Sequence, residues 1–550
     1  MSPAHPTSLT RWMWFAAALL MLAEFLVFDR MTARHHTSVY PRWNDQIQYL
    51  TESYKAYEQA QTHGLAAGMK FSLTKTALQG TLHDFFALLV FKLVGAASRR
   101  AALSLNLLVF LAWQASLLAI IPRVTGSRAL AWMGFGLLLC IAWPWSNGPG
   151  SAVDFRLDHG AMCLLGLTAT LALLTDGFRS TRWSVVFGAA VGFTLLERFL
   201  SGVYFAAIFG ASAAWIFCGA ARWPRLRNLI FAGLAATALA LPIFWFNREA
   251  IYTYYWVGHV SGAEGAARLR SMDLWGSVQF VFGHLGGMHL GKYFGWTVAG
   301  LTAPLLLLWL FSRGKPAAGP SRDWLFFALA FLLLPAAVLT VHPQKSEYVL
   351  GVLVPGVILL VLWGWSALWR QNDFSTAGTA HRLAPIALAL AALVAGECFF
   401  VQRQLAPPHT EDFLASARQV NAIADQIFST TRADHIANPN IAVDQIVDFA
   451  DAQILQVICY ERHKTWVNFV IQLPNSILED KDEVMLYRLK LCDFVLLTAE
   501  MPGDGYWPYD KQMRRLYPAL KDWCDDHLQL VETFPVFGRK MSLYQRPATL

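Results

Sequence analysis

The chain has 550 residues, of which 55% are hydrophobic and only 15% are charged. An average soluble domain carries roughly 25% charged residues, so this composition excludes an ordinary water-soluble protein. A net charge of +7 would suit a nucleic-acid partner, but the basic residues lie mostly between the apolar blocks. That distribution argues against nucleic-acid binding and favours a protein embedded in membrane lipid.

The apolar residues form eleven blocks that are long enough to cross a membrane. About 20 helical residues, at roughly 1.5 Å each, cross the roughly 30 Å hydrocarbon core. The predicted spans cover residues 12–28, 101–121, 128–145, 159–175, 183–198, 200–217, 228–246, 293–312, 324–341, 349–367 and 384–401. No small-residue cleavage site follows the first span, so we expect a retained anchor rather than a signal peptide.

A further apolar segment, residues 84–97, is too short to cross comfortably and carries Lys92 in its middle. We expect it to form a helix that lies in the membrane interface. With this segment left out, the short basic loops between spans all fall on one side, which the positive-inside rule makes cytoplasmic. The N-terminus is then also cytoplasmic. The polar loops 29–100, 146–158, 247–292 and 342–348 lie outside.

The chain changes character after residue 401, and we divide it into a transmembrane domain, 1–401, and a tail, 402–550. The tail alternates short apolar runs with helical patterns, which predicts an α/β domain outside the cytoplasm. The apolar runs lie at 494–497 and 528–531, and the helical patterns at 411–427 and 511–520.

Seven cysteines are divided between these two regions. Four lie in apolar blocks, where a small core residue is the ordinary interpretation. The tail contains Cys459, Cys492 and Cys524. In an oxidising compartment one pair of these could form a disulfide, and their spacing leaves the pairing open.

Asp45 is the main candidate for chemistry in the first outer loop, at the start of a predicted helix that carries Tyr49. As a helix N-cap, its carboxylate would accept hydrogen bonds from exposed backbone N–H groups. As a general base beside the membrane, it would instead deprotonate an acceptor hydroxyl for attack on an activated sugar. The sequence alone allows both roles.

The stretch Trp43-Asn44-Asp45-Gln46 and the segment that runs from Gly80 to Gly95 resemble the GT-C superfamily of membrane glycosyltransferases. The likeness is to the branch with protein O-mannosyltransferases and the aminoarabinose transferases that modify lipid A. It covers most of residues 10–400 in order and spacing. The resemblance implies a polytopic helical fold, a polyprenyl-phosphate-linked sugar donor, and an early acidic residue as general base, which Asp45 matches. The family often has two adjacent acids there, whereas this chain has Asn44-Asp45.

The second outer loop contains Asp154, Arg156, Asp158 and His159 just before a span. The resemblance matches Asp158 to an acid that lies near the first-loop acid. On a helical turn, Asp154 and Asp158 would face the same way and Arg156 would point elsewhere. A solvated loop with Asp–Arg pairs is the alternative. These carboxylates and His159 could hold a divalent cation, but their spacing is not distinctive, so no metal ligand and no certain cofactor is assigned.

A phosphate leaving group needs cations, because negative charge builds on it in the transition state. Lys345, in the turn between two spans, resembles the family's lysine-containing turn; a lysine that anchors the helix end is the alternative. A second cationic cluster lies in the third outer loop. The predicted catalytic residues are Asp45 and Asp158, and the predicted substrate-binding residues are Lys345, His342, Arg268, Arg270, His259, Glu264, Tyr348, Tyr49, Lys75, Asp154 and His159.

The sequence therefore predicts an inverting glycosyltransferase on the periplasmic face of a bacterial inner membrane, although an endoplasmic reticulum location stays open on physical grounds. The acceptor would be a lipid, a glycan or a protein. An O-antigen ligase or polymerase is an alternative enzyme, and it would depend on Arg268 and Arg270 rather than on Asp45. A lipid-linked glycan transporter or flippase is the non-enzymatic alternative, and it would need acids at mid-depth, whereas Glu24 and Glu397 lie near span ends.

Overall fold

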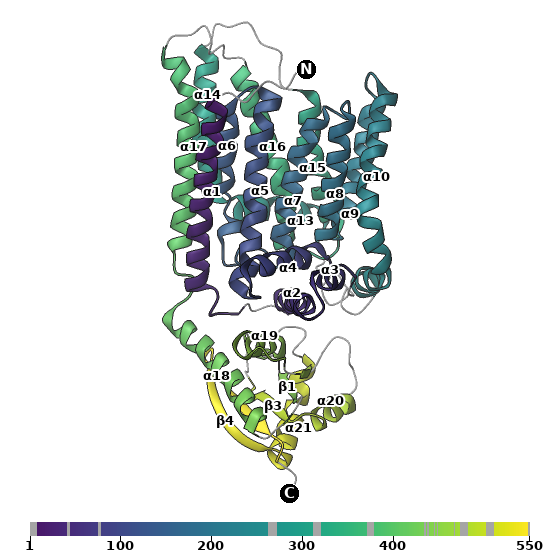
Figure 1. Ribbon diagram of the computed structural model, residues 1–550, viewed down its shortest axis with the longest axis vertical. Helices are drawn as coiled ribbons and strands as arrows, with labels where there is room; N and C mark the ends of the chain where they lie inside the picture. Colours follow the sequence, from purple (N-terminus) through teal and green to yellow (C-terminus); the bar gives the residue numbers. More distant parts are fainter. Residues whose placement is uncertain are drawn as a thin grey trace.

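The structure is a computed structural model in which a helical bundle adjoins a smaller sheet domain (Figure 1). It describes residues 8–40, 44–74, 79–261, 272–311, 321–370, 379–433, 436, 439–444, 446–447, 449–466, 468–473, 482–501 and 511–547. The fold is that of a polytopic α-helical membrane protein, as predicted.

In the described part of the chain, a helix coincides with each of the eleven predicted spans. These are α1 (Ser8–His35), α5 (Arg99–Thr125), α6 (Arg128–Leu139), α7 (Leu157–Ala172), α8 (Thr181–Glu197), α9 (Ser201–Phe217), α10 (Arg222–Phe246), α14 (Gly291–Phe311), α15 (Arg322–Val341), α16 (Val354–Arg370) and α17 (Thr379–Leu405). Short 3-10 turns are η1 (Trp143–Trp145), η2 (Leu173–Thr175) and η5 (Tyr348–Leu353). Among the same residues, eight helical segments are long and apolar enough to cross a membrane, and α6 and α9 are shorter apolar helices.

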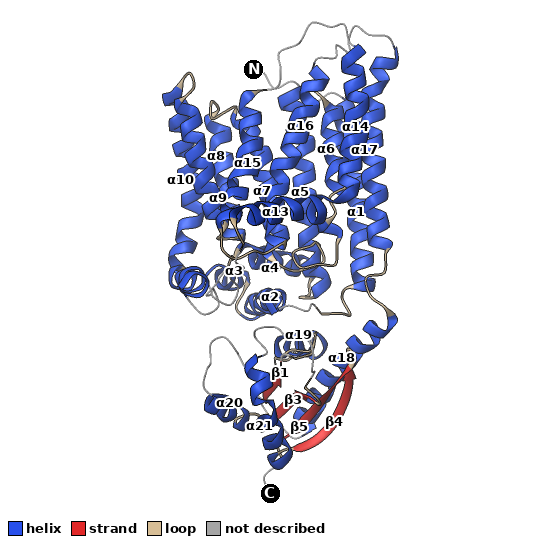
Figure 2. Cartoon of the chain, turned by 180° about the vertical axis from the view of Figure 1, so that it is seen from behind, coloured by secondary structure: helices blue, strands red, loops and turns tan. Residues whose placement is uncertain are grey.

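Three further helices lie at the end of the bundle that adjoins the sheet domain (Figures 1 and 2). They are α2 (Asn44–Thr62), α3 (Leu65–Thr74) and α4 (Leu82–Val94). Helix α4 corresponds to the interfacial segment predicted at residues 84–97, and in Figure 1 it runs across the bundle helices. Gly95, in the left-handed region with φ 82°, ends α4 by donating its backbone N–H to the carbonyl of Phe91.

The outer segment 247–292, which we expected to be a loop, is largely helical where the structure describes it. It contains α11 (Arg248–Ile251), the π-helix η3 (Tyr252–Ser261), α13 (Leu274–His284) and the π-helix η4 (Leu285–Leu290). The carboxylate of Asp273 caps α13 by accepting the backbone N–H of Gly276 at 2.6 Å. Helix α13, η4 and α14 belong to one apolar helical segment, Leu274–Leu310, of which the sequence analysis recognised only the part from residue 293.

The C-terminal region is an α/β domain, as predicted. Its elements are α18 (Glu411–Ala433), β1 (Asn440–Asp444), α19 (Ala452–His463), β2 (Asn468–Leu473), α20 (Asp482–Lys490), β3 (Phe494–Thr498), α21 (Lys511–His527), β4 (Gln529–Val536) and β5 (Arg539–Gln545). The strand order is β2-β1-β3-β5-β4, with β1 parallel to β2 and β3, and with β5 antiparallel to β3 and β4. A two-residue turn, Phe537 and Gly538, both with positive φ, closes the β4–β5 hairpin.

All seven cysteines are free in the structure. Cys459, Cys492 and Cys524 are buried in the C-terminal domain, with Cys492 and Cys524 in one hydrophobic cluster, and the disulfide that the sequence left open is not formed in this structure. Their burial raises the pKa of each thiol to about 12.

Helices α6 and α17 cross at very short range, and two glycines make this possible. A Cβ atom added to Gly396 would lie 2.3 Å from the carbonyl oxygen of Gly136, and one added to Gly136 would lie 2.4 Å from that of Ala392. Both obstacles are backbone atoms, which cannot rotate away. Small residues allow this kind of close packing between membrane helices.

We expect Gly396→Ala to lower the thermal unfolding temperature of the purified chain, because the added methyl group must push the two helices apart. Overpacking of this kind typically costs about 1–3 kcal/mol. Gly364→Ala is the matched control, since a Cβ atom there would meet nothing within 4 Å. Equal unfolding temperatures for the two variants would contradict the close packing of α17 against α6 at Gly396.

Candidate active site

Asp45 lies in the first turn of α2. Its Oδ2 atom accepts a hydrogen bond from Nη2 of Arg156 at 2.5 Å, and its side chain is 44% exposed. A carboxylate in a first helical turn also interacts favourably with the helix dipole. One oxygen of Asp45 is therefore held by a guanidinium while the side chain stays accessible from outside.

Arg156 immediately precedes α7 and is buried between two acids. Its Nε atom lies 3.6 Å from Oδ2 of Asp158, and its guanidinium carbon lies 4.5 Å from the ring centre of Tyr348. Burial opposes the charged form, but the attraction of Asp45 and the other nearby acids outweighs it and holds the pKa of Arg156 above its usual value. Arg156 is therefore a fixed cation beside Asp45.

The expectation that Arg156 would point away from the acids was wrong. It assumed a helical turn that carries both Asp154 and Asp158. Helix α7 begins only at Leu157, so Asp154 lies outside it and the backbone at Arg156 is extended. The guanidinium consequently reaches both Asp45 and Asp158.

Asp158, in the first turn of α7, connects Arg156 to a second arginine. Its Oδ1 atom accepts a hydrogen bond from Nη1 of Arg198, the residue that follows α8, and its side chain is only 5% exposed. Asp45, Arg156, Asp158 and Arg198 thus form an alternating charge chain. Such alternation offsets the cost of burying each ion, which is roughly several kcal/mol for an unpaired one.

The backbone near Arg198 is held by α4. Nδ1 of His83 lies 3.0 Å from Oε1 of Glu197, both side chains are buried, and the His83 ring packs 4.2 Å from the ring of Phe155. Gly80 is required in this contact, because a Cβ atom there would lie 2.1 Å from the carbonyl oxygen of Glu197. Sequence reasoning missed His83 and gave Arg198 no role. The available signal was the charged pair Glu197-Arg198 inside an apolar block.

Tyr49 follows Asp45 by one helical turn and is buried. Burial, and then the negative charge of Asp45, raise the pKa of its phenol well above the usual value. Tyr49 therefore keeps its proton and can act as a hydrogen-bond donor beside Asp45. Tyr348, the first residue of η5, lies against the face of Arg156.

Asp154 and His159 are buried in the packing behind the charge chain. Oδ2 of Asp154 accepts the backbone N–H of Gly150 at 2.5 Å, and Nε2 of His159 lies 3.1 Å from the carbonyl oxygen of Asn106. The Asn106 side chain donates to the carbonyl oxygen of Asp154 at 2.9 Å. Asp154 thus fixes the shape of the second outer loop.

The residues considered for a divalent cation do not converge on one point. Asp154 is bound to Gly150, His159 faces Asn106, and Arg156 lies between Asp45 and Asp158. In the ranges that the structure describes, no three His, Cys, Asp or Glu side chains are arranged to hold a metal ion. The donor set here therefore does not fit a divalent cation.

Lys345 lies at the end of α15, where its Nζ atom donates to the carbonyl oxygens of Leu339, Thr340 and His342 at 2.7–3.1 Å. Partial burial lowers the pKa of its ammonium. His342 is the residue after α15, and its Nδ1 atom lies 3.1 Å from the carbonyl oxygen of Gln344. Binding of a phosphate by Lys345 remains a prediction, and it would require the ammonium to leave part of this helix end.

Several predicted substrate-binding residues lie outside the described residues. These are Lys75, Glu264, Arg268 and Arg270, together with the side chain of His259. Their predicted roles are untested.

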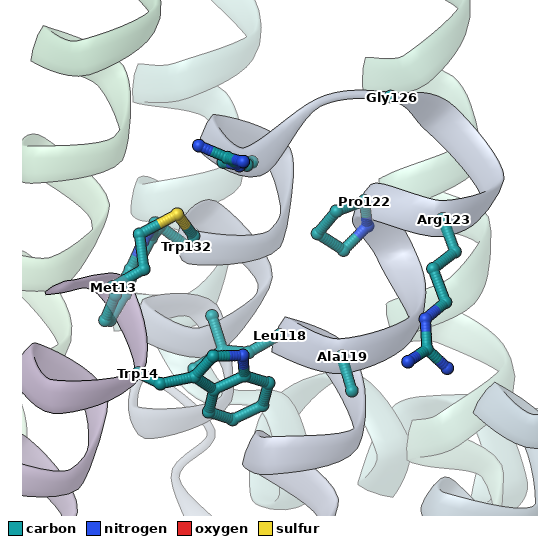
Figure 3. Close-up of a pocket in the computed structure, with 9 residues that line it drawn as sticks. Met13, Trp14, Leu118, Ala119, Pro122, Arg123, Gly126 and Trp132 are labelled. Atoms are coloured by element: carbon teal, nitrogen blue, oxygen red, sulfur yellow. The ribbon is translucent and has the colours of Figure 1, made fainter. Parts of the chain in front are cut away.

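A cavity of about 350 Å³ lies between α1, α5 and α6 and is lined by residues that include Met13, Trp14, Leu118, Arg123 and Trp132 (Figure 3). None of the predicted site residues lines it. This cavity and the charge chain of Asp45, Arg156, Asp158 and Arg198 are therefore separate features of the bundle.

The helical bundle, helices α2–α4 and the C-terminal sheet domain together resemble a solved structure over nearly the whole chain. The first structural match is ArnT from Cupriavidus metallidurans in the apo state, with a TM-score of 0.59 and 14% identity over 98% of each chain. This likeness confirms the predicted fold class. At such low identity it shows the fold alone, and function must be argued from the site.

Two structures of an oligosaccharyltransferase from Archaeoglobus fulgidus also match. One, tethered with an acceptor peptide, has a TM-score of 0.47 and 10% identity, over 88% of this chain and 69% of that chain. The other, AglB in complex with an inhibitory peptide and a dolichol-phosphate, has a TM-score of 0.45 and 10% identity, over 94% and 72%. No protein-family profile and no curated protein sequence matches this chain.

The burial of Asp154 predicts a pH-dependent stability. Burial raises its pKa to about 7, although Arg156 and the Gly150 N–H favour the ionised form. An unfolded Asp has a pKa of about 3.9. The contribution of the protonated Asp154 carboxyl to the free energy of unfolding is therefore fully present below about pH 4 and is lost as pH rises to about 7. Asp154→Asn keeps an oxygen acceptor for Gly150, so we expect the unfolding temperature of this variant to change less with pH over this range. Unfolding temperatures that change equally with pH in the variant and the wild type would refute this role.

Proposed function

We propose that this chain is an inverting glycosyltransferase that moves a sugar from a polyprenyl-phosphate-linked donor to an acceptor at the periplasmic face of a bacterial inner membrane. The observation that carries the proposal is the half-exposed carboxylate of Asp45, fixed by a buried arginine at one end of a membrane bundle with a GT-C-type fold. Asp45 is the proposed general base. The acceptor is a lipid, a glycan or a protein.

Asp45 is well arranged to take a proton from an acceptor hydroxyl. Arg156 donates to Oδ2, and the Asp45 side chain is 44% exposed, so the carboxylate is held on one side while it stays accessible to an acceptor. Asp158 and Arg198 keep the Arg156 guanidinium in place from behind. The deprotonated hydroxyl would then attack the anomeric carbon from the face opposite to the leaving phosphate, which inverts the configuration.

The leaving phosphate acquires negative charge as its bond to the sugar breaks, and cations must stabilise it. We propose this role for Lys345, Arg268 and Arg270. His259, His342, Glu264 and Lys75 are the further proposed donor-binding residues. Tyr49 and Tyr348 would contact the sugar. The phosphoester of the donor supplies the free energy of transfer, so no nucleotide is needed.

The orientation of the chain follows from the distribution of its charge. The short connections at the end of the bundle away from α2–α4 are basic, which is typical of the cytoplasmic side; among the described residues they contain Arg123, Arg128, Arg179, Arg182 and Arg222. We therefore propose that the N-terminus is cytoplasmic and that α2–α4 and the C-terminal domain lie in the periplasm.

The base assignment is tested with Asp45→Asn, assayed with labelled undecaprenyl-phosphate sugars and with lipid, glycan and peptide acceptors. Loss of a general base typically lowers the rate by about 10² to 10⁴, so we expect a reduction in kcat of that size. Asp29→Asn is the matched control, because Asp29 forms an exposed ion pair with Arg100 outside the charge chain. Normal transfer by folded Asp45→Asn would remove the base assignment. A dominant loss in Arg268→Ala or Arg270→Ala, with Asp45 dispensable, would favour a ligase or polymerase.

We also expect transfer to continue after exhaustive treatment with a metal chelator. Arg156 already lies between Asp45 and Asp158, where a divalent cation would otherwise bridge two acids. The check is the initial rate before and after chelation, together with the metal content of the purified chain. Loss of transfer that magnesium or manganese restores would show that this reasoning is wrong.

A further inference from the structure

Glu461, on α19 of the C-terminal domain, is bound by two tyrosines from the region around α2. The hydroxyl of Tyr40 donates to Oε2 of Glu461, and the hydroxyl of Tyr54 donates to Oε1. Tyr40 precedes α2 and Tyr54 lies within it, so the two donors are located on either side of Asp45 in the chain. One carboxylate thus fastens the segment that carries the proposed base at two points.

Burial keeps both tyrosines in their protonated, donating form. Burial, and then the charge of Glu461, raise the pKa of Tyr40 and of Tyr54 well above the usual value. The Tyr54 ring also lies 5.4 Å from the ring of Tyr460, the neighbour of Glu461 on α19. The contact is therefore a packed interface rather than a loose surface pair.

A second contact fastens the following part of α2 to the same domain. Nε1 of Trp466 donates to Oε2 of Glu58 at 2.7 Å, and the ammonium of Lys55 lies 5.5 Å from the Trp466 ring. Tyr460 stacks on Trp466 with ring centres 4.2 Å apart. Helix α2 is thus attached to α19 and to the residues just after it.

Arg99 links this interface to the second outer loop. It is 5% exposed, its Nη1 atom donates to the carbonyl oxygen of His36 at 2.7 Å, and its guanidinium carbon lies 5.7 Å from the ring of Tyr40. Both Glu461 and Asp154 attract it electrostatically. One buried cation therefore faces the C-terminal domain and the loop that presents Arg156.

We propose that Glu461 is a positioning residue for Asp45, so that docking of the C-terminal domain on α2 sets the rate of the transfer step. This inference rests on the proposed function. Glu461 itself touches no reacting atom; it fixes the segment from Tyr40 to Tyr54 in the geometry in which Arg156 reaches Asp45. The C-terminal domain is then a part of the catalytic apparatus rather than an appendage.

The test compares Glu461→Gln with Asp425→Asn in the full-length chain in detergent micelles. Asp425 lies on α18 and contacts the same helix through Arg462 and His463. Both substitutions remove one carboxylate charge that contacts or lies on α19, and both preserve the shape of the side chain. They differ in whether α2 loses a partner.

We expect Glu461→Gln to lower kcat by about ten- to a hundredfold, because small misplacements of a catalytic group cost up to about that much. The KM for the undecaprenyl-phosphate sugar should stay unchanged, since Glu461 makes no donor contact. Asp425→Asn should keep wild-type kcat. Combining Glu461→Gln with Tyr54→Phe should lower kcat little beyond the single variant, because both changes break the same contact.

Amide hydrogen exchange provides a readout that does not depend on activity. We expect faster exchange over residues 45–50 in Glu461→Gln and not in Asp425→Asn, because the start of α2 loses its anchor. Unchanged exchange, or faster exchange with wild-type kcat, would overturn the positioning role. So would a lower kcat that only tracks a lower yield of folded chain.

Different results would contradict the positioning role of Glu461 and the base role of Asp45. If Asp45→Asn is inactive while Glu461→Gln retains full kcat, the positioning role falls and the proposed function stands. If the wild-type chain transfers no sugar, or if folded Asp45→Asn transfers it normally, the proposed base falls and the positioning role falls with it.

Discussion

An alternating chain of two acids and two arginines joins α2, α7 and the end of α8, which are far apart in the sequence. Arg156, Asp158 and Arg198 are buried and compensate one another, and the half-exposed Asp45 ends the chain; without this pairing, burial of the three inner ions would cost roughly several kcal/mol each. The surrounding elements hold the backbone on either side of these charged residues. Helix α4 fixes the backbone beside Arg198, and the bends around Gly150 and Asp154 bring Arg156 between its two carboxylates.

Much of the architecture follows from lengths and periodicities in the sequence. Spans are recognised because a membrane requires a minimum apolar length, and segment 84–97 was recognised as interfacial because it falls short of that length. The tail was recognised as α/β because its short apolar runs alternate with helical patterns. The minimum-length rule for spans failed at α13, because its apolar stretch alone is too short for a full span and segment 247–292 was therefore expected to be a loop.

The site was only partly predictable from the sequence. Asp45 and Asp158 were singled out because they match a family pattern, and the structure joins both to Arg156; their catalytic roles stay predictions. The pairing of Arg156 depended on where α7 begins, and a shift of a helix start by a few residues reverses the direction of a side chain. The contact of Glu461 with Tyr40 and Tyr54 spans 421 and 407 residues, and no local pattern encodes so distant a partner.

The free cysteines of the C-terminal domain have a consequence for how this region is held together. Cys459, Cys492 and Cys524 are buried, and burial raises the pKa of each thiol so far that little reactive thiolate is present at neutral pH. No disulfide joins β1–β5 and α18–α21 in this structure, so the contacts that hold these elements together are non-covalent. The protonated thiols fill space in the hydrophobic core as small apolar side chains do.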